Sequence, residues 1–308
     1  MDGTLEIFAT RFLGIFIEAV PFLLLGTLAS GLIEVFIRKE DIVRLMPRNP
    51  VLATAMGGGM GFIFPVCECG VVPVTRRLFN KGLPLSVGIT FLLSAPVMNP
   101  VVVASTYAAF GWGPVLVLRF VMTAIVAIGV GLVFTLQTRP QRILRPRMVA
   151  LPISGGSAEA AQLAPSPQRM PLLPGLQRAL VLARGEFFEM GRYLILGSLI
   201  AAAMGTFGVD KDIEALASNP VNSVFIMQLT GFVLSVCSTV DSFLALAFAN
   251  TFTTGSILAF LVYGPMVDIK STMMYLGVFR RKIVAYLIIL PFLITALISI
   301  FLNLNVAF

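Results

Sequence analysis

The sequence has no histidine, only three cysteines and few charged residues. The lack of histidine excludes a His-based zinc site, a Ser-His-Asp triad and a haem with histidine ligation. Charged residues make up 12% of the 308 residues, about half of what soluble domains carry, while apolar residues make up 57%. A chain this poor in charge, with a mean hydropathy of +0.95, excludes a soluble enzyme, a secreted disulfide scaffold and a disordered chain. The composition predicts a polytopic membrane protein.

Long apolar runs are abundant, and six of them are long enough to cross a bilayer, which takes about 20 residues. These runs are Ile7–Ile37, Pro84–Phe110, Pro114–Gln137, Gly185–Phe207, Thr254–Phe279 and Ile283–Leu302. Two further apolar stretches, Val51–Thr75 and Asn222–Asn250, are interrupted by glycine, cysteine or charged residues.

The basic residues lie in the connections between the runs, which by the positive-inside rule places those connections in the cytoplasm. Basic connections flank Val51–Thr75 on both sides, so this stretch is expected to enter and leave on the cytoplasmic face as a re-entrant hairpin. By the same argument Asn222–Asn250 enters and leaves from outside, because an acidic segment precedes it and an uncharged one follows. The alternative is that both hairpins are ordinary spans, which gives eight helices.

The two halves also resemble each other at an offset of about 170 residues, at which Cys67 matches Cys237 and Asn99 falls opposite Asp268. We therefore predict an all-α membrane protein of two inverted repeats, each with three transmembrane helices and one re-entrant hairpin. The repeats span residues 1–137 and 178–308. Residues 138–177 form a proline-rich basic segment, which predicts a flexible cytoplasmic linker.

The first candidate site is Cys67-Glu68-Cys69, bracketed by helix-breaking prolines. This motif is expected at the tip of the first hairpin, with Cys237 at the equivalent point of the second. Thiolates favour soft species, so Cys67 and Cys69 are candidate contacts for a soft metalloid. The alternative is that each buried cysteine is a small hydrophobic residue.

The second candidate site consists of two proline-interrupted segments, one around Pro96 and Asn99 and the other around Pro265, Asp268 and Lys270. A proline removes a backbone hydrogen bond inside a helix, and charged groups at membrane depth face protein or water. These residues predict a substrate site between broken helices. The alternative is a structural hydrogen-bond network that holds the helices.

Acidic residues elsewhere are candidates for ion or proton coupling. With Lys270, the candidates are Asp241, Asp268, Glu18 and Glu189. Arg192 is a candidate partner for Glu189 three residues before it, whereas Glu18 has no such neighbour and needs a tertiary partner or a water path. The alternative for both acids is a structural pairing. Glu34 and Arg119 lie nearer helix ends, where their side chains reach the surface, so no function is assigned to them.

The segment FPVCECGVVP at residues 64–73, followed by SAPVMNP at residues 94–100, resembles the ArsP/YraQ-type predicted permeases of bacteria and archaea. The resemblance covers nearly the whole chain. It implies about eight transmembrane segments and an efflux permease for trivalent organoarsenicals, with Cys67 and Cys69 at the cysteines of the family motif.

Together these observations predict a secondary transporter in the bacterial or archaeal cell membrane. Substrate contacts are expected at Cys67, Glu68, Cys69, Cys237, Asn99, Pro96 and Pro265, and no cofactor is expected. The expected partners are the lipid bilayer and a small thiophilic or anionic solute, with a homo-oligomer as an open alternative and no nucleic acid. Two other functions stay open: a membrane thiol redox enzyme or sulfur or electron carrier that uses Cys67 and Cys69, and a channel with a re-entrant filter.

Overall fold

The computed structural model describes residues 2–37, 40–42, 46–47, 49–63, 66–135, 172–207, 219–249 and 251–305. Within these ranges the chain is helical and contains no strand. The helices are α1 (Asp2–Phe36), α3 (Pro50–Ile63), α4 (Glu68–Asn80), α5 (Leu85–Ser94), α6 (Pro100–Phe110), α7 (Pro114–Thr135), α9 (Leu172–Phe207), α11 (Pro220–Leu234), α12 (Asp241–Phe248), α13 (Thr254–Met266), α14 (Ile269–Val278) and α15 (Arg281–Asn305). Residues 138–171 of the expected linker lie outside the described ranges, and residues 172–177 belong to α9.

Five segments are long and apolar enough to cross a membrane: Thr4–Phe36, Pro114–Thr135, Leu173–Met204, Thr254–Val278 and Arg281–Asn305. The sixth expected span, Pro84–Phe110, is divided into the short helices α5 and α6. The described part is thus all-helical, and the chain is a multi-pass membrane protein.

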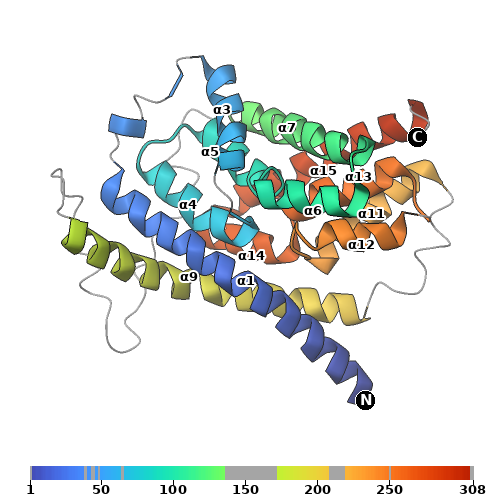
Figure 1. Ribbon diagram of the computed structural model, residues 1–308, viewed down its shortest axis with the longest axis horizontal. Coiled ribbons are helices and arrows are strands. Elements are labelled where there is room, and N and C mark those ends of the chain that lie inside the picture. Colours follow the sequence, from blue (N-terminus) through green and yellow to red (C-terminus); the bar gives the residue numbers. More distant parts are fainter. Residues whose placement is uncertain are drawn as a thin grey trace.

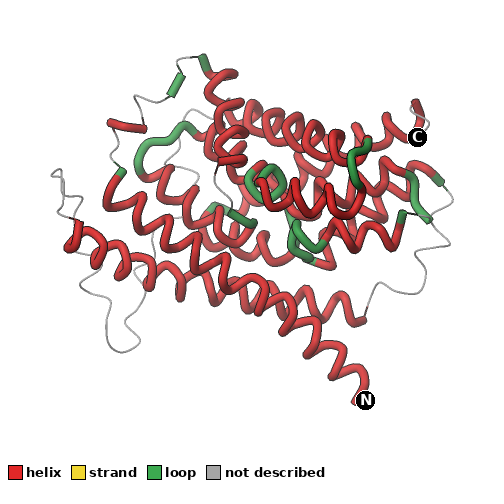
Figure 2. Tube along the Cα trace, in the orientation of Figure 1, coloured by secondary structure: helices red, strands yellow, loops and turns green. Residues whose placement is uncertain are grey.

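Helix breaks in the middle of the bundle are the main feature of the fold. The break between α5 and α6 contains Pro96, and α13 ends one residue after Pro265, as the sequence predicted. Breaks also separate α3 from α4 and α11 from α12. Figure 2 shows short non-helical segments in the middle of the view as well as at the ends of the bundle. Non-helical backbone at membrane depth is stable only where protein or a wet cavity covers it, and residues 95–97 are buried.

The helices α3–α7 and α11–α15 make matching sets of contacts. In the first set α5 packs against α3 and α7; in the second α13 packs against α11 and α15. The sets meet through α7 and α15, and also through two crossed pairs, α4 with α14 and α12 with α6. The first helix after each mid-bundle break therefore contacts a short helix of the other set.

The long helices α1 and α9 lie side by side along one edge of the bundle (Figure 1). Helix α1 also packs on α4, and α9 packs on α14. Glycines allow these close crossings, because a Cβ at Gly26 would overlap the backbone of Gly70 and one at Gly31 would overlap the carbonyl of Ala179. Small residues permit such close backbone approach between membrane helices.

We expect Gly26→Val to destabilise the fold by about 1–3 kcal/mol, because the added side chain separates α1 from α4. The measurement is the thermal midpoint of the detergent-solubilised protein, followed by size-exclusion chromatography. Gly14→Val is the matched control on the same helix, because nothing lies within 4 Å of a Cβ at Gly14. Equal midpoints for both variants would contradict this account of the crossing.

Candidate substrate and coupling site

A buried ion pair joins the two halves of the chain at the start of α4. The Nζ atom of Lys270, on α14, lies 2.8 Å from Oε1 of Glu68, and both side chains are at most 2% exposed. Glu68 is the first residue of α4, where the N-terminal end of the helix dipole favours a negative charge. Lys270 also donates to the Ser235 carbonyl at 3.4 Å, at the end of α11. One ammonium group thus holds together α4, α14 and the end of α11.

Asp268 completes this arrangement, and we call Glu68, Asp268 and Lys270 the central charge cluster. Oδ1 of Asp268 accepts from the backbone N–H of Ser271 and so caps α14, while Oδ2 lies 3.7 Å from the Lys270 ammonium. Asp268 and Lys270 thus lie close together at the start of α14, but the nearer partner of Lys270 is Glu68.

The central charge cluster has unused hydrogen-bonding capacity. Oε2 of Glu68 and Oδ2 of Asp268 are buried and make no hydrogen bond within the described part of the chain. Two carboxylates face a single ammonium, so the cluster has one carboxylate more than it has cations. Buried charge without a partner is costly, which makes this cluster a candidate for taking up a proton or another cation.

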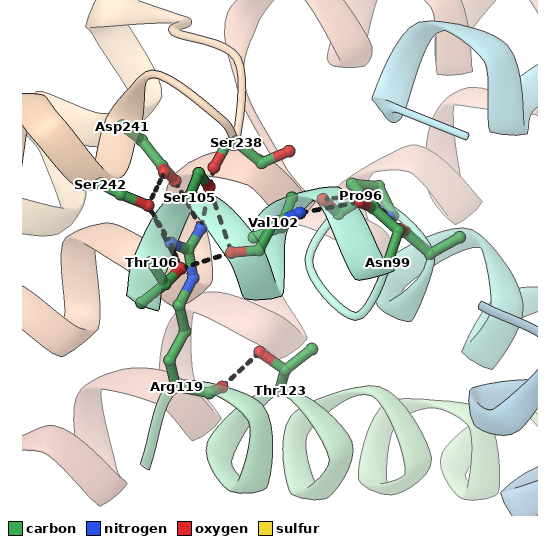
Figure 3. Close-up of polar contacts among 11 residues, drawn as sticks. Pro96, Asn99, Val102, Ser105, Thr106, Arg119, Thr123, Ser238, Asp241 and Ser242 are labelled. Carbon is green, nitrogen blue, oxygen red and sulfur yellow. Dashed lines mark hydrogen bonds and ion pairs between the residues drawn. The ribbon is translucent and has the colours of Figure 1, made fainter. Parts of the chain in front are cut away.

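A second buried ion pair crosses between the halves in the opposite sense. Nη2 of Arg119, on α7, lies 2.7 Å from Oδ2 of Asp241, the first residue of α12. Nη1 of Arg119 donates to Thr106 on α6 and to Ser242 on α12, both at 2.8 Å, so its head group sits where the two short helices meet (Figure 3). The expectation that Arg119 reaches the membrane surface is wrong, because its side chain is fully buried.

The two pairs are equivalent in kind. Glu68 and Asp241 each begin the helix that follows a mid-bundle break, and each is paired with a cation from the other half of the sequence. Sequence analysis named both acids and Lys270 but missed Arg119. The available signal was that Arg119 stands alone in an apolar run from Pro114 to Thr135.

All three cysteines are buried, free thiols in one core cluster. Cys67 and Cys69 lie at the start of α4, and Cys237 lies in the loop after α11. The half-buried Glu18 on α1 has Lys270, Glu68 and Cys237 as neighbours, and its need for a tertiary partner or a water path stays a prediction. Within the described residues, no group of three or more acidic or cysteine side chains is arranged to hold a metal ion.

Asn99 and Pro96 lie in the break between α5 and α6, and the polar atoms of the Asn99 side chain bond to nearby backbone. Oδ1 of Asn99 accepts from the N–H of Val102 and caps α6, while Nδ2 donates to the carbonyls of Ala95 and Pro96. Figure 3 shows Asn99 and Pro96 at one end of α6 and Arg119 near the other. Pro265 is buried within α13, next to the break. These residues shape the backbone around the site.

A further group of charges ties the end of α4 to α1 and α9. Nη1 of Arg76 lies 2.9 Å from Oε1 of Glu189. The pairing of Glu189 with Arg192 suggested by the sequence is therefore wrong. Arg192 instead stacks over the Tyr193 ring. Arg77 lies 3.0 Å from Glu186, a buried acid that sequence analysis did not select. Glu189 therefore serves a cross-helix ion pair away from the central charge cluster.

Comparisons with known proteins agree with this architecture. The family model ArsP_1, described as a predicted permease, matches residues 4–304. The UPF0718 protein YcgR of Bacillus subtilis is 41% identical over 279 residues, covering 90% of this chain and 90% of that protein. A putative two-component membrane permease complex subunit of Streptococcus mutans is 36% identical over 275 residues, covering 89% and 87%.

No solved structure matches the chain. The family match covers almost every residue, and both relatives align over most of their length. The resemblance seen in the sequence is confirmed: the chain belongs to the ArsP-type predicted permease family and is a membrane transporter rather than an enzyme.

Proposed function

We propose that the chain is a secondary transporter that exports a small thiophilic solute, with a trivalent organoarsenical as the expected substrate, by alternating access. The observation that carries this proposal is the gathering of free thiols and the central charge cluster between broken helices from both halves. Soft thiol ligands suit a thiophilic metalloid. Interrupted helices where two repeats meet are the usual location of a transport site.

The substrate class follows from the balance of charge. The central charge cluster already has two carboxylates to one ammonium, so an anion would compete with Glu68 for Lys270. A neutral or cationic thiophile avoids that competition. Cys67 and Cys69 then supply the soft contacts, with Cys237 on the opposing loop. Asn99, Pro96 and Pro265 hold the backbone that surrounds the substrate.

The proposed architecture is two inverted repeats, residues 1–137 and 178–308, joined by a cytoplasmic linker at 138–177. Each repeat contains one re-entrant hairpin, α3–α4 in the first and α11–α12 in the second. The matching helix contacts and the two crossed ion pairs support this arrangement. Both pairs join the halves, so rocking of one half against the other would break and remake them in turn.

Energy for export comes from an ion gradient in this proposal, with Asp268 and Glu68 as the groups that exchange a proton around Lys270. Asp241 and Glu18 are secondary candidates, and Glu189 acts through its pair with Arg76. The chain resides in the bacterial or archaeal cell membrane. The Streptococcus mutans relative is named as a subunit of a permease complex, and we extend this to the chain as a proposal that it works with a partner protein.

The test is uptake of a trivalent methylarsenical into inside-out vesicles that contain the purified chain. Replacing Cys67 and Cys69 together by serine is expected to abolish gradient-dependent uptake, because the soft contacts are lost. Cys237→Ser is the companion variant and is expected to weaken uptake less. Unchanged uptake in the double variant would remove the thiols from the mechanism.

The same preparation separates the open alternatives. A carrier saturates with substrate and stops when the proton gradient is collapsed, whereas a channel conducts a steady current across a planar bilayer. A thiol redox enzyme turns over in detergent without a sealed compartment. Current or turnover of this kind, without gradient-dependent uptake, would overturn the proposal.

A further inference from the structure

A line of buried polar side chains runs along the interior of the second half, between α11, α13 and α15, and we call it the polar seam. Its members on α15 are Thr295, Ser299 and Asn303, which recur every four residues and so share one face of the helix. Gln228 on α11 and Ser256 on α13 face the same interface. Thr295, Ser299, Gln228 and Ser256 are all fully buried.

The outer end of the polar seam is a closed hydrogen-bond network near the ends of α11 and α15. Ser256 lies 2.7 Å from Ser223, and Nδ2 of Asn303 donates to the Pro220 carbonyl at 2.9 Å. Oδ1 of Asn303 accepts from the N–H of Gly255 at 3.0 Å. Asn303 is half-buried and Pro220 is exposed, so this end of the seam reaches the surface of the bundle.

The middle of the polar seam is unsatisfied. Nε2 of Gln228 donates to the Phe292 carbonyl at 3.2 Å, which directs the amide at α15, but its Oε1 has no partner within the described residues. The hydroxyl oxygens of Thr295 and Ser299 also have none. Buried polar atoms without a protein partner are the places where internal water is found.

The inner end of the polar seam approaches the central charge cluster. The Tyr263 hydroxyl on α13 lies 3.5 Å from the Ile288 carbonyl, one turn from Phe292, and Tyr263 is close enough to Asp268 to sense its charge. From Ile288 to Asn303 the helix rises about 22 Å, more than half of a hydrocarbon core of about 30 Å. The polar seam, with Tyr263 at its inner end, therefore extends over more than half of the hydrocarbon depth, and Tyr263 precedes Asp268 by five residues in the chain.

The matching interface in the first half, between α3, α5 and α7, lacks these features. There the hydroxyl of Thr90 donates to the Ala127 carbonyl at 3.2 Å, and that of Thr54 donates to the Pro50 carbonyl at 2.8 Å. Gly131 sits against Thr90 and the Ser86 backbone, without space for a side chain. Within the described residues, the run of unsatisfied hydroxyl and amide atoms is thus a property of the α11–α13–α15 interface and has no counterpart between α3, α5 and α7.

We infer that the polar seam holds a file of water molecules that connects the outer end of the bundle with Asp268, and that this file is the path by which protons reach the central charge cluster from outside. The inference rests on the proposed proton-coupled export, for which the outer face is the proton-rich side. Around Asp268 the path meets Lys270, Glu68 and Tyr263. The side chains of α11 and α15 that line this path have no other role in the proposed mechanism.

Thiol accessibility tests the water file without measuring transport. In a background with the three native cysteines replaced by serine, Thr295→Cys and Ser299→Cys are introduced one at a time and exposed to Ag⁺ from outside. Ag⁺ is small enough to travel along a water file and binds thiols. Both thiols are expected to be lost, as measured by later maleimide labelling of the denatured protein.

Ala296→Cys is the matched control, because Ala296 is buried next to Thr295 but packs against Val224 and Ala259. Its thiol is expected to survive. Protection of all three thiols would overturn the inference, and so would reaction of all three. The expected pattern supports the water file even if arsenical uptake fails, so the two proposals fail separately.

A second measurement uses the protein with its three native cysteines in place. Hydroxyl radicals made by X-rays from bound water oxidise side chains beside that water, so Tyr263 is expected to be oxidised although it is buried. Oxidation is expected to fall when Gln228→Leu and Thr295→Val together remove the seam's polar groups. The exposed Tyr107 on α6 is the internal reference for the radical dose, and its oxidation is expected to be the same in both proteins. Oxidation of Tyr263 that the double variant leaves unchanged would contradict the water file.

Discussion

Lys270→Met is expected to be the most damaging single substitution in the chain. It leaves Glu68 and Asp268 buried, close together and without a cation. Removing one partner of a buried pair costs about 3–5 kcal/mol, and here two carboxylates lose the same partner. We expect a large fall in the thermal midpoint of the purified protein and little monodisperse material in size-exclusion chromatography.

The controls for this prediction distinguish charge from shape. Lys282→Met removes an exposed ammonium and is expected to leave the midpoint unchanged. Adding Glu68→Gln and Asp268→Asn to Lys270→Met removes the uncompensated charges and is expected to recover most of the folded protein, but not arsenical uptake. A Lys270→Met protein as stable as the parent would show that the central charge cluster carries no unbalanced charge.

Arg119→Met is expected to have the second largest effect. The substitution leaves the Asp241 carboxylate buried without its cation and removes the donor that joins Thr106 to Ser242. The expected loss is again about 3–5 kcal/mol of folding free energy, measured as a fall in thermal midpoint. Arg119→Lys keeps the charge but cannot make all of these contacts, so an intermediate midpoint is expected.

The double variant Arg119→Met with Asp241→Asn separates stability from transport. It removes both charges, and replacing a whole buried pair is often nearly neutral for stability. We therefore expect recovery of the midpoint together with loss of uptake, because the α12 end of the bundle is no longer held by α7. A double variant that is stable and fully active would exclude a role for this pair in transport. Arg281→Met, at an exposed position, is the control for loss of one arginine.

The composition and the long apolar runs were sufficient to predict a helical membrane protein, because a chain with so little charge has no soluble alternative. Local chemistry also predicted the helix breaks beside Pro96 and Pro265, since a proline cannot donate the next helical hydrogen bond. The break at Pro96 explains why Pro84–Phe110 forms two short helices instead of one span.

Which charges pair was a different problem. Sequence spacing suggested Glu189 with Arg192, but the closer cation is Arg76, far away in the chain. Arg119 was expected to reach the surface from near a helix end. Its side chain is instead fully buried, because α12 brings the Asp241 carboxylate within ion-pair distance of it. Spacing along one helix carries no information about partners from another half of the molecule.

The sequence alone determined that the chain resides in a membrane, that its helices are interrupted and that sulfur and carboxylate groups lie at the interruptions. These follow from local properties: apolar length, proline chemistry and residue type. Only the tertiary structure decided that Glu68 meets Lys270 and that Asp241 meets Arg119. It also decided that Oε1 of Gln228 and the hydroxyls of Thr295 and Ser299 have no partner among the described residues. The physical reason is that a buried charge takes whichever partner the packing of distant helices brings within about 3 Å, and no local rule specifies that packing.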